Sequence, residues 1–368
     1  MKVLYIFSTS IISGAEYVSI DLIKTDRQNE YFVLTSDIPE LCKLLEDIIP
    51  VSHIYKSKWL RLQKVSSSRG ILKLFRLIKK AFSVFIVRNK IRRLEKKIKP
   101  DLIIGHNTHD AIFLYKSSTK KILQVYDYLT KTSHLYFMVK SSYENVSKYI
   151  VDSTGLKKNL VSVGLDAYKI EVVPNSISVK LKEPKKIAEK SFVLLWIGSF
   201  EDRKDPLEFF KILELLIKNN FEFEVNFVFR KTDLLYYEKN FNHINDLSKY
   251  RKINVFENLP RKDLEKIYER SNILIFTSKE DSCPVVVVET MSFGIPVISK
   301  DIDGVYELIE PGKNSFLYKE INEIPVFLSQ MLLNYSEFSK NALETIKKSF
   351  SPEAKLKNVQ KIFNELLT

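Results

Sequence analysis

The chain has 368 residues, of which 45% are hydrophobic and 28% are charged. This length and composition predict a globular protein with two domains of ordinary size. Its two cysteines, Cys42 and Cys283, are too few for a disulfide-stapled secreted domain. A strand is predicted directly after Met1, which leaves no room for a signal peptide, so we expect the protein in the reducing cytosol.

The first half of the chain alternates short apolar runs with helical segments. Strands are predicted at 2–8, 101–104, 121–127, 149–153 and 170–176. This order predicts an α/β fold with a doubly wound parallel sheet. The loop after the first strand contains Gly14, which either lets the backbone approach a ligand or is a plain turn residue.

Positive charge is concentrated in one segment. Residues 56–99 contain sixteen Lys or Arg and one acid, Glu95, so this segment has a charge of +15. The whole chain has a net charge of +13, so the remaining residues sum to −2. Within the basic segment, residues 69–85 have the period of an amphipathic helix. Its apolar face holds Ile71, Leu74, Phe75, Ile78, Ala81, Phe82 and Phe85, and its basic face holds Arg69, Lys73, Arg76, Lys79 and Lys80.

Such a helix is too short and too charged to span a bilayer. A basic amphipathic helix is typical of a segment lying on an anionic membrane surface, so we predict membrane contact through about Arg69–Lys99. The alternative is a helix that packs its apolar face on the first domain. Nucleic acid is disfavoured, because the phenylalanines do not interleave with the basic residues as a stacking platform would require.

The second half of the chain begins after a charged, Pro-containing linker at 178–190. A strand at 193–198 is followed by Arg203 and Lys204 and by a helix at 206–218. A second strand at 272–276 leads into a loop and then a helix at 285–293, and a further strand follows at 296–299. Strands alternating with helices again predict a doubly wound parallel sheet.

The loop between the 272–276 strand and the following helix is the strongest candidate for a ligand site. It carries Glu280, Asp281 and Ser282, and Glu289 lies inside the helix. The free N–H groups at a helix start, here around Cys283, Pro284 and Val285, bind phosphate or hydroxyl groups. Arg203 and Lys204 are either part of a solvated turn before the 206–218 helix or fixed cations that bind an anionic group, since Arg supplies a planar pair of donors and Lys a point charge.

These residues resemble a known family. Asp281 to Pro284, Glu289, Gly294 to Val297 and Gly304-x-x-Glu307 resemble the acidic-x(7)-Glu signature of the family-four retaining glycosyltransferases with the GT-B fold. The family usually has Glu where this chain has Asp281, with Glu280 just before it, so either carboxylate is a candidate to face the sugar. The resemblance implies that Glu289 binds the ribose of a nucleotide sugar and that Arg203 and Lys204 hold its diphosphate.

The resemblance implies the rest of the reading. Two Rossmann-like domains, 1–177 and 191–349, would face each other across a cleft, and a closing helix at 350–368 would cross back to the first. The enzyme would move a hexosyl or N-acetylhexosaminyl group from a nucleotide sugar, with UDP favoured, to a lipid-linked glycan, by metal-independent, retaining, front-face transfer at the inner face of the plasma membrane. His106 or Asp127 would face the cleft and contact the donor sugar; a strand-end histidine bonded to backbone is the alternative for His106.

Other readings remain open. A catalytically inactive GT-B-like scaffold that binds membranes or partners is the main alternative, supported by Asp281 and by Ser13 in place of a glycine. An epimerase or a phosphorylase would share the fold. His106 and His109 have the spacing of a metal pair, but no acid or cysteine cluster completes a site, so we predict no metal and no cofactor.

Overall fold

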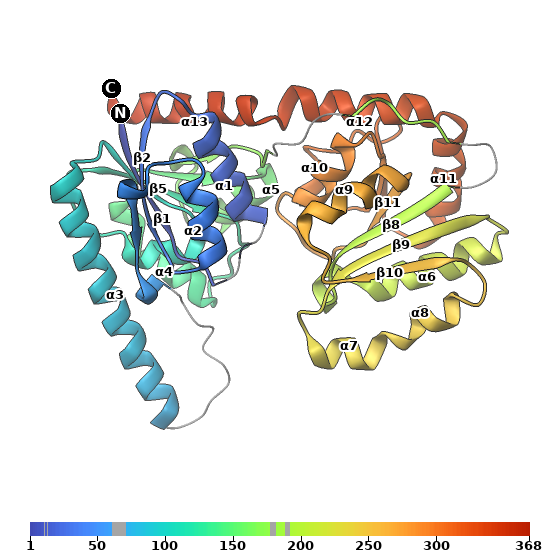
Figure 1. Cartoon of the computed structure of the whole chain (residues 1–368), viewed down its shortest axis with the longest axis horizontal. Helices are drawn as coiled ribbons and strands as arrows, with labels where there is room; N and C mark the ends of the chain where they lie inside the picture. The colour runs from blue at the N-terminus through green and yellow to red at the C-terminus, as the bar shows by residue number, and fades with distance from the viewer. Residues whose placement is uncertain (11, 13, 61–70, 177–181, 188–191) are drawn as a thin grey trace. The chain divides into compact units, whose positions relative to one another are not determined.

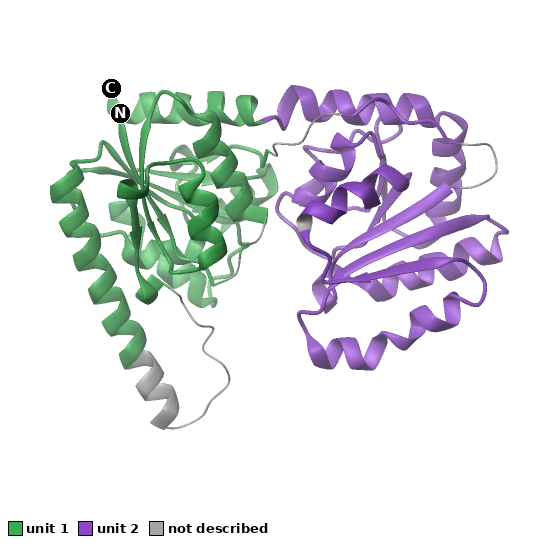
Figure 2. Ribbon diagram, in the orientation of Figure 1, with its two compact units in different colours: residues 1–176, 352–368 green, residues 177–351 purple. Residues whose placement is uncertain are grey.

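The computed structural model describes residues 1–10, 12, 14–60, 71–176, 182–187 and 192–368, with backbone only at 71–77 and 261. The chain divides into two compact units (Figure 2). Unit 1 is Met1–Ser176 together with Pro352–Thr368, and unit 2 is Ile177–Ser351. The last helix therefore belongs to the first unit, as predicted.

Unit 1 is built on a seven-stranded parallel sheet in the order β3-β2-β1-β4-β5-β6-β7 (Figure 1). Its strands are β1 (Lys2–Phe7), β2 (Glu30–Thr35), β3 (Ile54–Lys56), β4 (Leu102–Gly105), β5 (Lys120–Val125), β6 (Lys148–Val151) and β7 (Ile170–Val172). Most are runs of Val, Ile, Leu and aromatic residues, because helices cover both faces of such a sheet. The strand order reverses between β1 and β4, which is where doubly wound sheets open a crevice.

The helices of unit 1 are α1 (Gly14–Thr25), α2 (Pro39–Glu46), α3 (Ile71–Ile98), α4 (His134–Ser142), α5 (Thr154–Ser162) and α13 (Pro352–Leu367). Helix α13 packs beside α1. Its Val359, Ile362 and Phe363 are buried in the same cluster as Tyr5 and Leu22. The core of unit 1 is therefore completed by residues from the far end of the chain.

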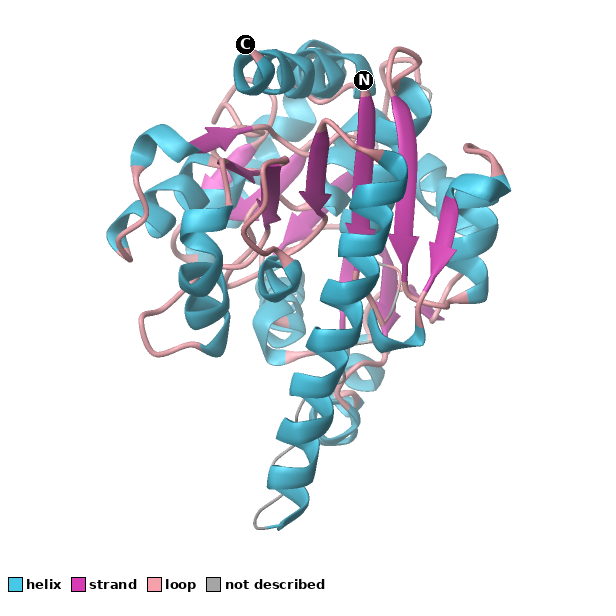
Figure 3. Ribbon diagram, turned by 90° about the vertical axis from the view of Figure 1, so that its left-hand side faces the viewer, coloured by secondary structure: helices cyan, strands magenta, loops and turns pink. Residues whose placement is uncertain are grey.

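Helix α3 has two different apolar faces. Its C-terminal half buries Val87, Ile91, Leu94 and Ile98 in the core of unit 1. The side chains of Ile78, Phe82 and Phe85 are instead 59, 54 and 60% exposed. At 100° per residue the two sets lie on opposite sides of the helix. Figures 1 and 3 show the N-terminal half of α3 extending beyond the sheet that its C-terminal half covers.

The described part of the predicted apolar face is therefore mostly exposed, although Phe82 makes an edge contact with Trp59 at 5.7 Å between ring centroids. Arg69 lies outside the described residues, as do the side chains of Ile71 to Leu77. The C-terminal half of α3 is also held on unit 1 by polar contacts. Glu95, the single acid of the basic segment, accepts hydrogen bonds from the hydroxyls of Tyr115, Ser117 and Thr119.

Unit 2 is a six-stranded parallel sheet in the order β10-β9-β8-β11-β12-β13. Its strands are β8 (Phe192–Ser199), β9 (Phe223–Arg230), β10 (Ile253–Glu257), β11 (Ile273–Phe276), β12 (Val297–Lys300) and β13 (Phe316–Tyr318). Its helices are α6 (Pro206–Lys218), α7 (Leu234–Asn240), α8 (Asn242–Leu247), α9 (Arg261–Arg270), α10 (Val285–Ser292), α11 (Ile324–Leu333) and α12 (Tyr335–Ser349). The doubly wound parallel sheet predicted for each half of the chain is confirmed.

Candidate active site

The candidate site of unit 2 lies where its strand order reverses. Strands β8 and β11 are neighbours in the sheet, and the chain leaves them in opposite directions to β9 and β12. Loops after the carboxyl ends of two such strands converge and form the usual ligand site of an open α/β sheet. Arg203 and Lys204 follow β8, and Asp281 follows β11, so the topology brings the predicted basic pair and acidic loop together.

The local sequence fixes the basic loop. Asp202–Lys204 form a single 3-10 turn, and Asp205 then adopts a left-handed conformation with φ of 48°. The Asp205 carboxylate accepts a hydrogen bond from the Glu208 N–H at 3.2 Å and so caps α6, whose first residue is Pro206. The cap stops the turn directly after Lys204, which holds the basic pair at the end of β8.

The two loops are joined by an ion pair. Lys204 Nζ lies 2.5 Å from Asp281 Oδ2, and both side chains are mostly buried. Arg203 is half exposed; it donates to the Glu280 carbonyl oxygen at 3.2 Å and lies 3.9 Å from Asp281 Oδ2. Of the two candidate acids, Asp281 therefore contacts the cations through its carboxylate, and Glu280 does so through its backbone.

A second set of hydrogen bonds connects the same two loops to the buried interior of unit 2, and the sequence did not predict it. The indole Nε1 of Trp196 donates to Thr277 Oγ1 at 3.0 Å, and the Thr277 hydroxyl donates to the Lys204 carbonyl oxygen at 2.9 Å. The Lys279 N–H donates to the Arg203 carbonyl oxygen at 2.9 Å. Trp196 and Thr277 are both buried, so the basic pair is fixed from inside the unit. A Trp within a strand gives no sign in the sequence of which loop it supports.

Gly304 holds a third loop against the site. A Cβ atom at this position would lie 1.9 Å from the Asp281 carbonyl oxygen and 2.8 Å from the Ser282 carbonyl carbon. No side chain fits there, because real Cβ contacts are not shorter than 3.0 Å. The glycine of the Gly304-x-x-Glu307 pattern therefore allows the backbone after β12 to touch the acidic loop.

The remaining predicted donor residues surround the start of α10. Ser282, Cys283 and Pro284 are buried, Val285 is the first helical residue, and no side chain caps the helix at Pro284. Glu289 lies within the helix and is 9% exposed. The Tyr268 hydroxyl donates to Glu289 Oε2 at 3.0 Å. The structure thus brings Glu289 and the α10 start together within unit 2.

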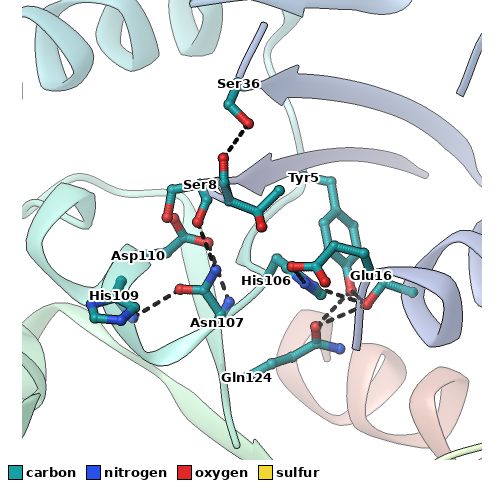
Figure 4. A network of polar contacts seen from close by, with 11 residues as sticks. Tyr5, Ser8, Glu16, Ser36, His106, Asn107, His109, Asp110 and Gln124 are labelled. Carbon is teal, nitrogen blue, oxygen red and sulfur yellow. Dashed lines mark hydrogen bonds and ion pairs between the residues drawn. The ribbon is translucent and has the colours of Figure 1, made fainter. Parts of the chain in front are cut away.

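In unit 1 the corresponding reversal carries a buried polar network (Figure 4). His106 follows β4 and is fully buried, with Nε2 at 3.2 Å from Glu16 Oε1 and Nδ1 at 3.0 Å from Ser19 Oγ. Its ring stacks on Phe7 with centroids 4.5 Å apart. The His106 partners are side chains from α1, so the backbone-bonded alternative does not describe it, and its role toward a donor sugar stays a prediction.

The network also contains a carboxyl with a shifted pKa. Burial raises the pKa of Asp110 from 3.8 to about 7, against the opposing influence of hydrogen bonds and of His106. Asp110 accepts a hydrogen bond from the Asn107 N–H at 3.2 Å and completes a capping box. Gly14, the other predicted residue of unit 1, is the first residue of α1.

Two properties bear on metals and membranes. Among the described residues, no group of three or more His, Cys, Asp or Glu side chains is arranged to hold a metal ion. Within the same part of the chain, no helix has the length and apolar character needed to cross a membrane.

The chain forms two doubly wound parallel domains, and the second has a cationic loop and the helix that carries Glu289 at its strand reversal. This arrangement is that of the GT-B class of glycosyltransferase folds. A solved structure supports this. Anabaena Alr3699/HepE in complex with UDP has a TM-score of 0.76 and 18% identity, over 99% of this chain and 100% of that one.

Sequence comparison finds similarity to glycosyltransferases. Residues 179–324 match the family model described as Glycosyl transferases group 1. An Escherichia coli UDP-Gal:alpha-D-GlcNAc-diphosphoundecaprenol alpha-1,3-galactosyltransferase is 21% identical, over 100% of this chain and 97% of that protein. A lipopolysaccharide 1,6-galactosyltransferase of Salmonella typhimurium is 24% identical, over 61% of this chain and 62% of that protein. Residues 179–324 therefore resemble a glycosyl transferases group 1 domain, and the fold of the chain is that of the GT-B class.

Proposed function

We propose that this protein is a retaining glycosyltransferase that moves a hexosyl group from a UDP-sugar to a hydroxyl of a lipid-linked glycan. The observation that carries the proposal is the Lys204–Asp281 ion pair, which joins the basic loop to the loop that runs into α10, the helix that carries Glu289. A nucleotide sugar requires both parts: fixed cations for the diphosphate and a carboxylate for the ribose hydroxyls.

The Lys204–Asp281 ion pair has a defined part in this proposal. Without a donor, the carboxylate neutralises a cation that would otherwise be poorly solvated in a mostly buried position. A bound diphosphate would take over one side of Lys204, and Asp281 would keep Lys204 oriented or turn toward the sugar. Arg203 is half exposed and is available to bind the same diphosphate with a planar pair of donors.

The chemistry follows from charge stabilisation. As the bond between the sugar and the diphosphate breaks, negative charge grows on the leaving phosphate oxygen next to Arg203, Lys204 and the first turn of α10. The acceptor hydroxyl attacks from the same face, and the leaving phosphate oxygen takes its proton, so UDP leaves and the anomeric configuration is retained. Two protein cations supply the charge that a metal supplies in other sites, so we propose that no metal is required.

The identities of donor and acceptor rest on the relatives. Two of them are named galactosyltransferases, and the name of one gives UDP-Gal as its donor. One similar solved structure is a complex with UDP. One relative acts on a diphosphoundecaprenol-linked sugar and the other on lipopolysaccharide. These names favour a UDP-hexose donor and a lipid-linked acceptor.

Calorimetric titration with UDP, GDP and a panel of their sugars, first without metal and then with Mg²⁺, tests the donor site. We expect micromolar, metal-independent binding of UDP that is lost in Glu289→Ala and in Lys204→Ala. Lys211→Ala, on α6 in the same unit, is the matched control and should bind as the wild type does. Failure of every nucleotide to bind would refute the donor site and favour the inactive scaffold.

We also propose that α3 docks on the anionic membrane that holds the acceptor. The outer stripe of α3, defined as Ile78, Phe82, Phe85, Arg92, Arg93 and Lys96, lies opposite its buried face, and all six side chains are exposed. Apolar side chains at the projecting end would enter the acyl boundary, and the cations further along would meet lipid phosphates, at about 1 kcal/mol per Lys or Arg.

Vesicle sedimentation tests the docking. Wild-type protein should bind vesicles containing phosphatidylglycerol and not purely zwitterionic ones, and binding should weaken in high salt. Replacing Ile78, Phe82 and Phe85 by Ser should release the protein, whereas Phe137→Ser, which removes an equally exposed phenylalanine from α4, should not. Equal binding by both variants would refute the outer stripe as the docking surface.

A further inference from the structure

Tyr268 and Glu289 form a buried pair behind the proposed donor site. The Tyr268 hydroxyl lies 3.0 Å from Glu289 Oε2, and the two side chains come from α9 and α10. Tyr268 is 3% exposed, and its ring stacks on Phe293 with centroids 5.0 Å apart. The phenol therefore has one orientation, and its hydroxyl is aimed at one oxygen of the carboxylate.

The end of α9 that carries Tyr268 is held by the segment connecting the two sheets. Lys185 Nζ donates to three backbone carbonyl oxygens, those of Tyr268 at 2.6 Å, Glu269 at 3.1 Å and Ser271 at 2.6 Å. A cation that satisfies the open carbonyls of a helix C-terminus stabilises that end. Lys185 is thus the cap of α9, and its position fixes the backbone of Tyr268.

The connecting segment is itself bonded to the helices around Glu289. The Lys185 N–H donates to Ser339 Oγ at 2.8 Å, and the Lys182 N–H donates to the Ser292 carbonyl oxygen at 3.3 Å. Lys182 Nζ forms ion pairs with Glu265 and Glu269 of α9 and lies 5.5 Å from the Phe293 ring centre. Residues 182–187 therefore brace α9 and α10 from outside.

We propose that Tyr268 is a positioning residue that orients the Glu289 carboxylate for the donor ribose, and that Lys185 of the connecting segment holds Tyr268 in place. The inference rests on the proposed function, since it takes Glu289 as the ribose ligand. A carboxylate offers about four acceptor positions, so the Glu289 carboxylate can keep the phenol and still accept a hydrogen bond from a ribose hydroxyl. A carboxylate fixed in advance loses no rotamer freedom when the ligand binds.

Nucleotide affinity separates this role from a purely structural one. Tyr268→Phe keeps the ring and removes the hydroxyl, and we expect the Kd for UDP to rise about 5- to 10-fold, the usual net weight of one intramolecular hydrogen bond. With a transfer assay, KM for the donor should rise and kcat should change little. Tyr335→Phe is the matched control, because it removes another buried phenol hydrogen bond in unit 2, to the Asn272 carbonyl oxygen at 2.8 Å.

A double-mutant cycle tests the connection to Glu289. In a Glu289→Gln background, Tyr268→Phe should have no further effect on UDP affinity, because the carboxylate that it orients is gone. Equal losses in both backgrounds, or a lower melting temperature with unchanged Kd, would overturn the positioning role. If the wild type binds UDP and Glu289→Ala does not, the proposed donor site stands whatever the outcome of the Tyr268 cycle.

Two lysines test the connecting segment. Lys185→Met keeps the aliphatic stem and removes the cap, and we expect a severalfold rise in the Kd for UDP. Lys186→Met removes the exposed neighbouring charge and should leave the Kd unchanged. Equal effects of the two substitutions would overturn the role of Lys185. Failure of the wild type to bind UDP would overturn the proposed function and, with it, this inference.

Discussion

Gly304→Ala should lower both the transfer rate and the UDP affinity of the proposed donor site, because the backbone around Asp281 must move. The new Cβ atom would lie 1.9 Å from the Asp281 carbonyl oxygen, where 3.0 Å is the lower limit of real contacts. The loop carrying Asp281 must therefore move by more than about 1 Å, or the 3-10 turn Asp303–Val305 must move away from it. A displacement of this size in a site that positions reacting groups costs about 100-fold in rate, equivalent to about 2.7 kcal/mol of transition-state stabilisation.

The assay compares transfer and UDP affinity in two glycine variants. Gly312→Ala is the control, because Gly312 has φ of 78° in open space, so Ala introduces only backbone strain of about 1 kcal/mol. Gly312→Ala should lower the melting temperature and keep wild-type affinity for UDP. Gly304→Ala should lose at least tenfold in UDP affinity and about 100-fold in kcat/KM.

Wild-type UDP affinity in Gly304→Ala would refute the reasoning. It would mean either that the two loops separate without moving Asp281 or that the Asp281 loop does not touch the donor. A crystal structure of the variant distinguishes these outcomes, because only the first leaves the Lys204–Asp281 ion pair intact.

Three further predictions follow from other contacts. Thr277→Val should lower the free energy of unfolding by about 2 kcal/mol in denaturant titration, because it leaves the buried Trp196 Nε1 without its acceptor, and it should also weaken UDP binding. Asp110→Asn should remove a pH dependence: with a folded pKa of about 7 against 3.8 unfolded, Asp110 contributes stability that is full below about pH 4 and is lost as pH rises through 7, at about 1.4 kcal/mol per pH unit. The wild type should therefore lose stability relative to Asp110→Asn between pH 5 and pH 7.5, and parallel curves would contradict the buried carboxyl. Residues 177–351 expressed alone should fold and bind UDP, as measured by calorimetry, and should not transfer sugar.

The fold was predictable because its signals are local. Buried parallel strands are short apolar runs, and β11 and β12 lie within about a residue of their predicted bounds. Helix α6 matches its predicted range of 206–218, because Asp205 and Pro206 mark its start. The strand alternation then restricts the topology to a doubly wound sheet.

The meeting of the two candidate loops of unit 2 was predictable, because it depends on chain direction. Residues just after a parallel strand must lie at the carboxyl edge of the sheet, so Lys204 and Asp281 had to converge once β8 and β11 were neighbours. Their supports were not predictable. Trp196 and Tyr268 act through contacts across 81 and 21 residues of sequence, and nothing in their local pattern distinguishes them from ordinary core aromatics.

Helix α3 shows a feature that the sequence did not predict. Sequence reasoning described one amphipathic face, and α3 has two, because its apolar positions shift by about half a turn between Phe85 and Val87. The second face depends on which end of the helix the sheet covers. That is a property of tertiary packing, and hydrophobic periodicity within a short window does not reveal it.

The two units also differ in how their cores are closed, and this difference has a consequence for folding. Unit 2 is one continuous stretch, so its contacts form within 175 residues of sequence. The core of unit 1 includes Phe363 in the same cluster as Tyr5, so this cluster joins residues from nearly the two ends of the chain. Long-range closure carries the larger entropy cost and is formed late. We therefore infer that unit 2 completes its core before unit 1 does, and that substitutions on the buried face of α13 destabilise unit 1 while leaving the candidate site of unit 2 formed.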